Sequence, residues 1–115
     1  MSTPVEQTLG HAGSSSATAR LTRKRQFAEL VQEWRDATAF TSSATAMAMH
    51  PAYQQIIGMG DAALPLIFQE LRRDPDHWFW ALKAITGEDP VAAGDRGQLD
   101  RMTVAWLNWA AEHGY

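Results

Sequence analysis

Apolar residues recur with a helical period along most of the chain. Phe27, Leu30, Val31 and Trp34 are spaced i, i+3, i+4 and i+7, which places them on one face of a helix. The other face carries charged residues, among them Glu29 and Glu33. The pattern predicts an amphipathic helix over residues 21–39, with this face turned to a core.

The same spacing returns further along the chain. Leu64, Ile67, Phe68 and Leu71 predict a helix over residues 61–73. Two weaker apolar stripes predict further helices. Phe79, Leu82 and Ile85 predict a helix over residues 74–86, and Met102, Trp106 and either Trp109 or Ala110 predict one over residues 99–111. No segment alternates with a period of two. The sequence therefore predicts an all-α class, a compact bundle of about five helices.

Capping residues predict two short helical segments in the middle of the chain. Ser43 is a favourable N-cap for a helical turn over residues 43–49. The dipeptide His50-Pro51 starts a further helix, because proline fits the first helical position, where its missing N–H costs nothing. That helix is expected to stop at Gly58, which can adopt a left-handed C-terminal conformation.

Caps also delimit the next helix pair. Asp61 is expected to cap the first of these helices, whose early Pro65 is tolerated because its N–H would have no partner. Asp74 and Pro75 are expected to restart the chain as N-cap and first residue of the second helix. Gly87 is expected to close it.

The N-terminal segment differs in texture from the rest. Residues 1–19 are rich in serine, threonine and glycine and show no apolar period, so we expect a disordered arm. Residues 20–115 are expected to form a single helical domain, consistent with the length of 115 residues.

Composition excludes several kinds of site. The chain has no cysteine, which rules out disulfides, a thiol nucleophile and cysteine-ligated metals. No apolar run approaches the roughly 18 residues that span a bilayer, so no membrane association is expected. The N-terminus lacks the apolar core of a signal peptide. We therefore expect a cytoplasmic protein.

Charge is distributed unevenly. Residues 1–25 carry four basic side chains, Arg20, Arg23, Lys24 and Arg25, against the single acidic Glu6, a net charge of +3. The remaining chain carries six basic and twelve acidic residues, a net charge of −6. The four basic residues are candidates for contacting nucleic-acid phosphates, although a solvated arm is the favoured explanation for them.

Candidate catalytic chemistry is sparse. His11, His50, His77 and His113 lie on different predicted elements, and none has the spacing of a metal site. We expect no metal, no cofactor and no phosphate-binding loop. A hydrolase-type enzyme using His50 or His77 is the weaker alternative. Acidic residues occur in pairs at Asp74/Asp76, Glu88/Asp89 and Asp95/Asp100, but nothing in the apolar pattern indicates a cleft in which they could act.

Three consecutive aromatic residues cannot all lie on one face of their predicted helix. Trp78, Phe79 and Trp80 span about 200° of a helix, because successive residues are about 100° apart. If Phe79 points into the core, Trp80 is expected to be partly exposed. Together with Trp106 and Trp109, Trp78 and Trp80 are candidates for contacting a protein, the alternative being a two-sided core.

One stretch resembles a known repeat. The pattern consists of Gly60, Ala63, Leu64, Pro65, Leu66, Leu71, Ala81, Leu82 and Ile85-Thr86-Gly87. It resembles one HEAT-like repeat of the kind seen in bacterial lyase-type HEAT proteins, and this resemblance implies a helical hairpin. More broadly, the run from His50-Pro51 to Trp106-Leu107 looks like a family of small bacterial proteins of no established activity. That resemblance implies no site residues.

These observations favour a non-catalytic protein–protein interaction module, such as a small adaptor, regulator or inhibitor. The expected partner is another protein, and a homo-oligomer is possible. A nucleic-acid-associated accessory protein that binds through the arm is the alternative.

Overall fold

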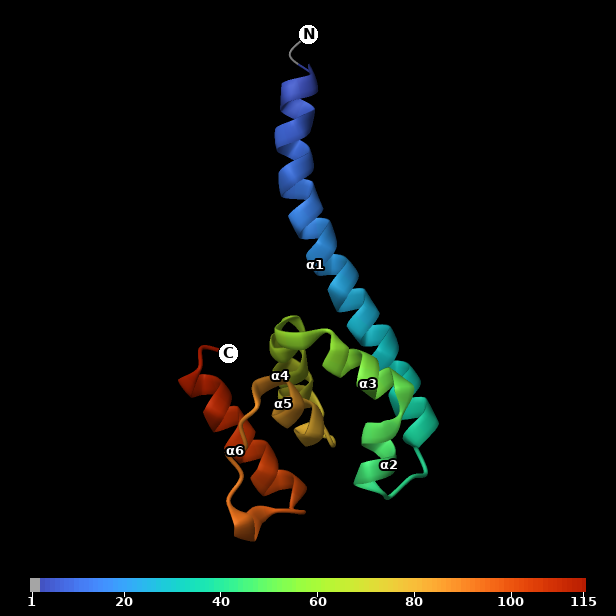
Figure 1. The fold of residues 1–115 in the computed structure, drawn as a ribbon, viewed down its shortest axis with the longest axis vertical. Helices are drawn as coiled ribbons and strands as arrows, with labels where there is room; N and C mark the ends of the chain where they lie inside the picture. The colour runs from blue at the N-terminus through green and yellow to red at the C-terminus, as the bar shows by residue number, and fades with distance from the viewer. Residues whose placement is uncertain (1–2) are drawn as a thin grey trace.

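A long N-terminal helix leads into a group of shorter helices (Figure 1). The computed structural model describes residues 3–115, with side chains from residue 17 onward. Helix α1 spans Thr3–Thr38, and its predicted apolar face is confirmed: Phe27, Leu30, Val31 and Trp34 are all buried. The described residues contain no strand, which confirms the all-α class.

Helix α1 starts at Thr3, earlier than the start predicted near Leu21. Once packing fixes the C-terminal half of a helix, each added residue gains one backbone hydrogen bond without a new nucleation step. The early part of α1 extends away from the other helices (Figure 1). From residue 17 onward, Phe27 is the first buried side chain. The disordered arm was predicted over residues 1–19, and the side chains of residues 1–16 lie outside the described part.

The extension sets the overall shape of the molecule. The Cα radius of gyration is 17.5 Å, whereas a compact domain of this length has about 13 Å. The principal extents of 67 × 33 × 23 Å show the same elongation. Residues 27–115 therefore form the packed body, and the preceding part of α1 is an arm that adds length.

The two short helices in the middle of the chain begin as predicted. Helix α2 spans Ala44–Met49, and the Ser43 hydroxyl accepts a hydrogen bond from the Ala46 N–H. Helix α3 spans Pro51–Gly58, and Nδ1 of His50 accepts from the Ala52 N–H at 3.0 Å. Both caps use local contacts, each worth about 1 kcal/mol.

The segment after α3 differs from the prediction. Gly58 is the last residue of α3, and the left-handed glycine is Gly60, with φ of 66°. Asp61 does not cap an α-helix, because a 3₁₀ turn, η1 (Gly60–Ala63), comes first. Helix α4 then spans Leu64–Arg73, and Pro65 lies in its first turn, where it is tolerated.

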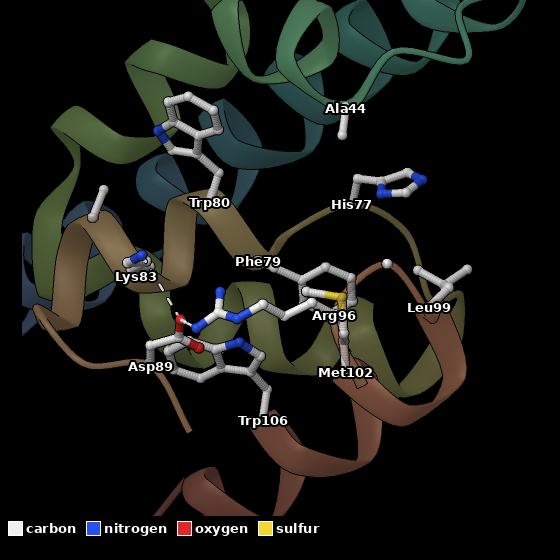
Figure 2. Close-up of a pocket in the computed structure, with 12 residues that line it drawn as sticks. Ala44, His77, Phe79, Trp80, Lys83, Asp89, Arg96, Leu99, Met102 and Trp106 are labelled. Atoms are coloured by element: carbon white, nitrogen blue, oxygen red, sulfur yellow. Dashed lines mark hydrogen bonds and ion pairs between the residues drawn. The ribbon is translucent and has the colours of Figure 1, made fainter. Parts of the chain in front are cut away.

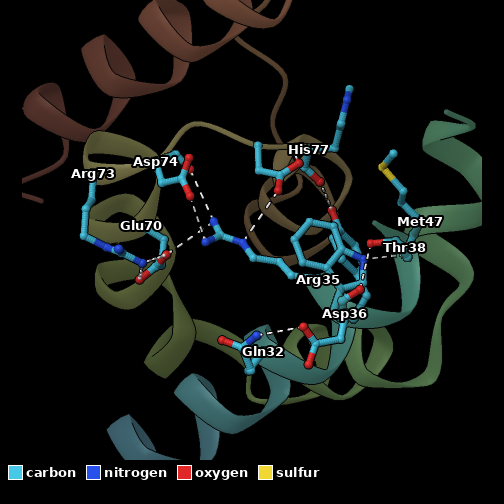
Figure 3. A network of polar contacts seen from close by, with 12 residues as sticks. Gln32, Arg35, Asp36, Thr38, Met47, Glu70, Arg73, Asp74 and His77 are labelled. Atoms are coloured by element: carbon cyan, nitrogen blue, oxygen red, sulfur yellow. Dashed lines mark hydrogen bonds and ion pairs between the residues drawn. The ribbon is translucent and has the colours of Figure 1, made fainter. Parts of the chain in front are cut away.

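The predicted helix start at Asp74-Pro75 is wrong. Helix α5 spans Phe79–Thr86. Residues 74–78, which connect α4 to α5, form an irregular segment. Asp74 and Asp76 instead form ion pairs with Arg35 of α1 at 3.0 and 3.6 Å (Figure 3). Their carboxylates are therefore engaged with another element and do not cap α5.

Gly87 closes α5 in the left-handed conformation, as predicted. A loop with a short 3₁₀ turn, η2 (Ala93–Asp95), leads to helix α6, which spans Leu99–Glu112. The chain end is tied to α4, because Arg72 donates a hydrogen bond to the Tyr115 carbonyl at 2.9 Å and the Tyr115 ring packs near Phe68.

Aromatic side chains join α1, α3 and the start of α5. The Trp78 ring lies 4.8 Å from Trp34, 5.9 Å from Phe27 and 6.0 Å from Tyr53, measured between centroids. Each such pair contributes roughly 0.5–1.5 kcal/mol beyond the buried area. The core is therefore aromatic where the arm-bearing helix meets the body. Among helices of the described chain, none is both long and apolar enough to cross a membrane.

Candidate functional site

An apolar groove of about 670 Å³ lies between α5, the following loop and α6. Its apolar lining includes Phe79 and Trp80 of α5 and Leu99, Met102 and Trp106 of α6. Figure 2 shows these side chains around a common space, with Ala44 facing it from the start of α2. The apolar pattern of the sequence did not indicate this groove.

Helix periodicity explains which α5 residues reach the groove. Phe79, Trp80, Lys83 and Ala84 line it, and residues spaced i, i+3 and i+4 share a helix face. Ala81 and Leu82 fall on the opposite side and are fully buried in the body. Helix α5 thus lies between core and groove.

A polar cluster borders the apolar surface. Oδ2 of Asp89 lies 2.8 Å from an Arg96 guanidinium nitrogen and 3.7 Å from Nζ of Lys83 (Figure 2). Oδ1 of Asp89 accepts a hydrogen bond from the Val91 N–H at 3.2 Å. These contacts fix the loop against α5 at one side of the groove.

The Asp89 carboxyl is held in its ionised form. Partial burial acts to raise its pKa, but the Val91 N–H and the Arg96 and Lys83 cations together hold the pKa below its ordinary value. At neutral pH the Asp89 carboxylate therefore binds the two cations and has no proton to donate.

The structure separates the four candidate tryptophans. Trp80 is 47% exposed and lines the groove, which confirms the prediction that the overfilled helix face leaves it partly outside. Trp78, Trp106 and Trp109 are buried at 0%, 1% and 9% exposure. These three side chains therefore offer little surface to a partner. Among the four candidates, only Trp80 has a widely exposed ring.

Aromatic neighbours cover the other three tryptophans, and for Trp109 they include Phe68 of α4 at 5.9 Å. Trp78 is covered by the aromatic residues of α1 and α3. Trp109 stacks on His113 at 3.9 Å and lies 5.6 Å from Trp106. Trp106 still contributes to the groove wall, although it is almost wholly covered.

The basic candidates lie away from the groove, on the arm. Arg20, Arg23, Lys24 and Arg25 are all exposed on α1. Arg20, Arg23 and Lys24 share one face through i, i+3 and i+4 spacing, whereas Arg25 is turned about 100° from Lys24. None of the four forms an ion pair within the described residues.

The histidines occupy separate positions. His50 caps α3 through Nδ1, and His113 stacks on Trp109. His77 lines the groove, with its ring 6.4 Å from Phe79. His11 lies outside the described side chains. Over the described part of the chain, no three histidine or acidic side chains gather as metal ligands would.

Of the acidic pairs Asp74/Asp76, Glu88/Asp89 and Asp95/Asp100, four members are bound by cations, whereas Glu88 and Asp100 form no ion pair among the described residues. Asp74 and Asp76 contact Arg35, and Asp95 contacts Arg101 at 3.3 Å. Of the carboxylates in these pairs, only Asp89 lines the groove, and it contacts Arg96 and Lys83. The arrangement favours recognition by shape and charge over acid–base chemistry.

The sequence did not predict the groove. One signal was available: Leu99, Met102 and Trp106 are spaced i, i+3 and i+7 on α6, and Lys83 and Arg96 bracket the acidic loop start. Their convergence depends on how the loop folds back, which periodicity does not encode.

Comparison of the chain with protein-family profiles, with curated proteins and with solved structures finds no match. The HEAT-like resemblance of residues 60–87 therefore stays a prediction.

Proposed function

We propose that the protein is a non-catalytic, cytoplasmic protein–protein interaction module that contacts its partner through Trp80 and the adjoining groove. The single observation that carries this proposal is the exposure of Trp80. Four of the five tryptophans are buried or nearly so, yet Trp80 is 47% exposed at the edge of an apolar hollow. Exposed tryptophan beside a pocket is the usual composition of an interaction hot spot.

The groove supports the same reading. Phe79, Met102 and Trp106 provide apolar walls into which a partner side chain can insert, and Lys83 and Arg96 provide a polar rim. An apolar centre with a charged rim is the anatomy of protein interfaces. Truncating a central tryptophan typically costs about 2 kcal/mol or more, which weakens binding about 30-fold.

The test compares Trp80→Ala with Phe40→Ala. Phe40 is fully exposed at 105% but does not line the groove, so it is a matched aromatic control. Partners captured by the wild-type chain from its source cell are measured quantitatively against both variants, with circular dichroism confirming that each is folded. We expect Trp80→Ala to lose a partner that Phe40→Ala retains. Equal capture by all three folded proteins contradicts the proposal.

A second copy of the chain is one partner that the same design detects. Sedimentation equilibrium of the wild type over a range of concentrations reports self-association directly. A dimer that Trp80→Ala weakens and Phe40→Ala does not identifies the groove as a homo-oligomer contact.

The second candidate function is nucleic-acid association through the arm. Arg20, Arg23 and Lys24 lie exposed on one face of the part of α1 that extends from the body (Figure 1). Three phosphate contacts would make binding about 40-fold weaker at 200 mM salt than at 50 mM salt. Anisotropy of a labelled DNA duplex measures this, with a triple glutamine variant of the three residues as comparison. Salt-independent binding, or equal binding by the variant, rules the arm out.

A further inference from the structure

The charged residues that line the groove are unequal in number. The two cations are Lys83 and Arg96, and the one anion is Asp89. Both cations contact the same carboxylate oxygen, at 3.7 and 2.8 Å. A single carboxylate offsets one cation, so the lining keeps one net positive charge.

That positive charge faces the solvent. The Lys83 and Arg96 side chains are 62% and 56% exposed, whereas the Asp89 side chain is only 20% exposed. The two cations are therefore more accessible to a molecule in solution than the carboxylate is. The neighbouring Arg101–Asp95 pair, at 3.3 Å, is internally balanced and lies outside the groove.

The groove is bounded by segments that are far apart in sequence. Ala44 comes from the start of α2, Phe79 and Trp80 from α5, Gly97 from the loop, and Met102 from α6 (Figure 2). The volume of about 670 Å³ is within the roughly 300–1,000 Å³ of small-molecule sites. It would hold roughly 20 water molecules, at about 30 Å³ each, against walls that are mainly apolar. Such a space suits a compact apolar body more than an extended chain.

We propose that the groove is a binding site for a small amphipathic acid, an aromatic or aliphatic body that carries one carboxylate. The body lies against Phe79, Trp80 and Met102, and the carboxylate meets Lys83 and Arg96. This inference goes beyond the proposed function, with which it shares only the premise that the groove is accessible. A ligand of this kind would compete with a protein partner for Trp80.

The probe is naphthalene-1-acetate, and its neutral counterpart is naphthalene-1-acetamide, which has nearly the same shape. Binding is followed by the five tryptophan indole N–H signals in ¹H–¹⁵N correlation spectra. We expect the acid to shift the signals of Trp80 and Trp106 and to leave that of the remote Trp34 in place. The amide should bind about threefold to tenfold more weakly, because an exposed charge contact contributes modestly.

Two variants separate charge from shape. Lys83→Gln keeps the 2.8 Å Asp89–Arg96 pair but leaves the groove lining neutral, so the preference for acid over amide should disappear. Arg101→Gln removes the same charge outside the groove and should retain the preference. Ala84→Phe, at an exposed lining position, should fill the groove and abolish binding of both probes.

Each result decides the proposal. Equal affinity for acid and amide overturns it, as does a preference that survives Lys83→Gln or a set of shifts that omits Trp80. If Lys83→Gln is poorly folded, the acid–amide comparison in wild type and Ala84→Phe carries the test. Probe binding that fails while Trp80-dependent partner capture persists removes this inference alone. Loss of the Trp80 requirement with intact probe binding removes the proposed protein contact alone.

Discussion

Tyr53 shows how one residue joins three elements. Its ring is fully buried beside Trp34 and Trp78, and its hydroxyl donates to the His77 carbonyl at 3.0 Å and accepts from the Ala81 N–H at 2.9 Å. Burial is the main cause that raises the pKa of this phenol, although the Ala81 N–H acts to lower it. The hydroxyl therefore stays neutral and keeps both hydrogen bonds.

Replacing Tyr53 with Phe tests this junction. The ring packing remains, but the His77 carbonyl and the Ala81 N–H lose their shared partner, so we expect a loss of about 1–3 kcal/mol in the free energy of unfolding. Urea denaturation followed by circular dichroism measures the change. An unaltered midpoint would mean that the α5 start is held by packing alone.

Asp89 gives a prediction about pH. Its folded-state pKa lies below the ordinary value, so it contributes stability above the unfolded pKa of about 4, and that contribution is lost as pH falls through the lower folded value. The wild type should therefore lose stability below about pH 4 more steeply than Asp89→Asn. Thermal melts over this range test the slope. Asp100→Asn is the control, because Asp100 is exposed and outside the ion pairs found among the described residues.

At the scale of elements, helix ends depend on a few backbone positions. Gly87 ends α5 with φ of 73°, a conformation that a side chain disfavours even though nothing lies within 4 Å of its Cβ position. Gly87→Ala should cost about 1 kcal/mol. Gly94→Ala is the matched control, since Gly94 also has open space and does not have positive φ. Equal melting temperatures for the two variants would show that the left-handed end is unimportant.

Local signals in the sequence predicted the helix ends that use local contacts. Ser43 and His50 cap their own helices through hydrogen bonds to residues two or three positions away, and Gly87 acts through its own backbone. Asp74 had the same local signal, but Arg35 lies 39 positions earlier and competes for its carboxylate. Capping preferences cannot reveal such a distant partner.

In the candidate site, too, features that depend on local geometry were predicted and features that depend on distant segments were not. The position of Trp80 followed from helix geometry, because three consecutive aromatic residues cannot share one face. The burial of Trp78 and Trp109 depends on α1 and on the chain end, and the groove depends on the loop after Gly87. These features arise from tertiary arrangement, so periodicity alone could not predict them.

At the scale of the molecule, Arg35 fastens α1 to the body. Its guanidinium contacts Glu70 at 3.4 Å, Asp74 at 3.0 Å and Asp76 at 3.6 Å, and its side chain is only 22% exposed (Figure 3). These carboxylates come from α4 and the segment that follows it. One side chain therefore joins three parts of the fold.

Arg35→Gln should destabilise the protein by about 1–3 kcal/mol, because it leaves the partly buried Glu70 and Asp76 and the exposed Asp74 without their shared cation. Arg73→Gln is the matched control: Arg73 is 63% exposed and contacts only Glu70, so its removal should cost about 0.5 kcal/mol or less. Chemical denaturation of both variants gives the comparison. A larger loss for Arg73→Gln would contradict this account of Arg35.

The arm of α1 has a consequence for how the molecule diffuses. A particle 67 Å long and 23 Å across experiences more friction than a sphere of the same 12.8 kDa mass. In gel filtration the monomer should elute early, near the volume of a larger globular standard, and rotational diffusion should be slower about the short axes than about the long one. An early peak alone would thus imitate a dimer, and light scattering would assign it the mass of one chain.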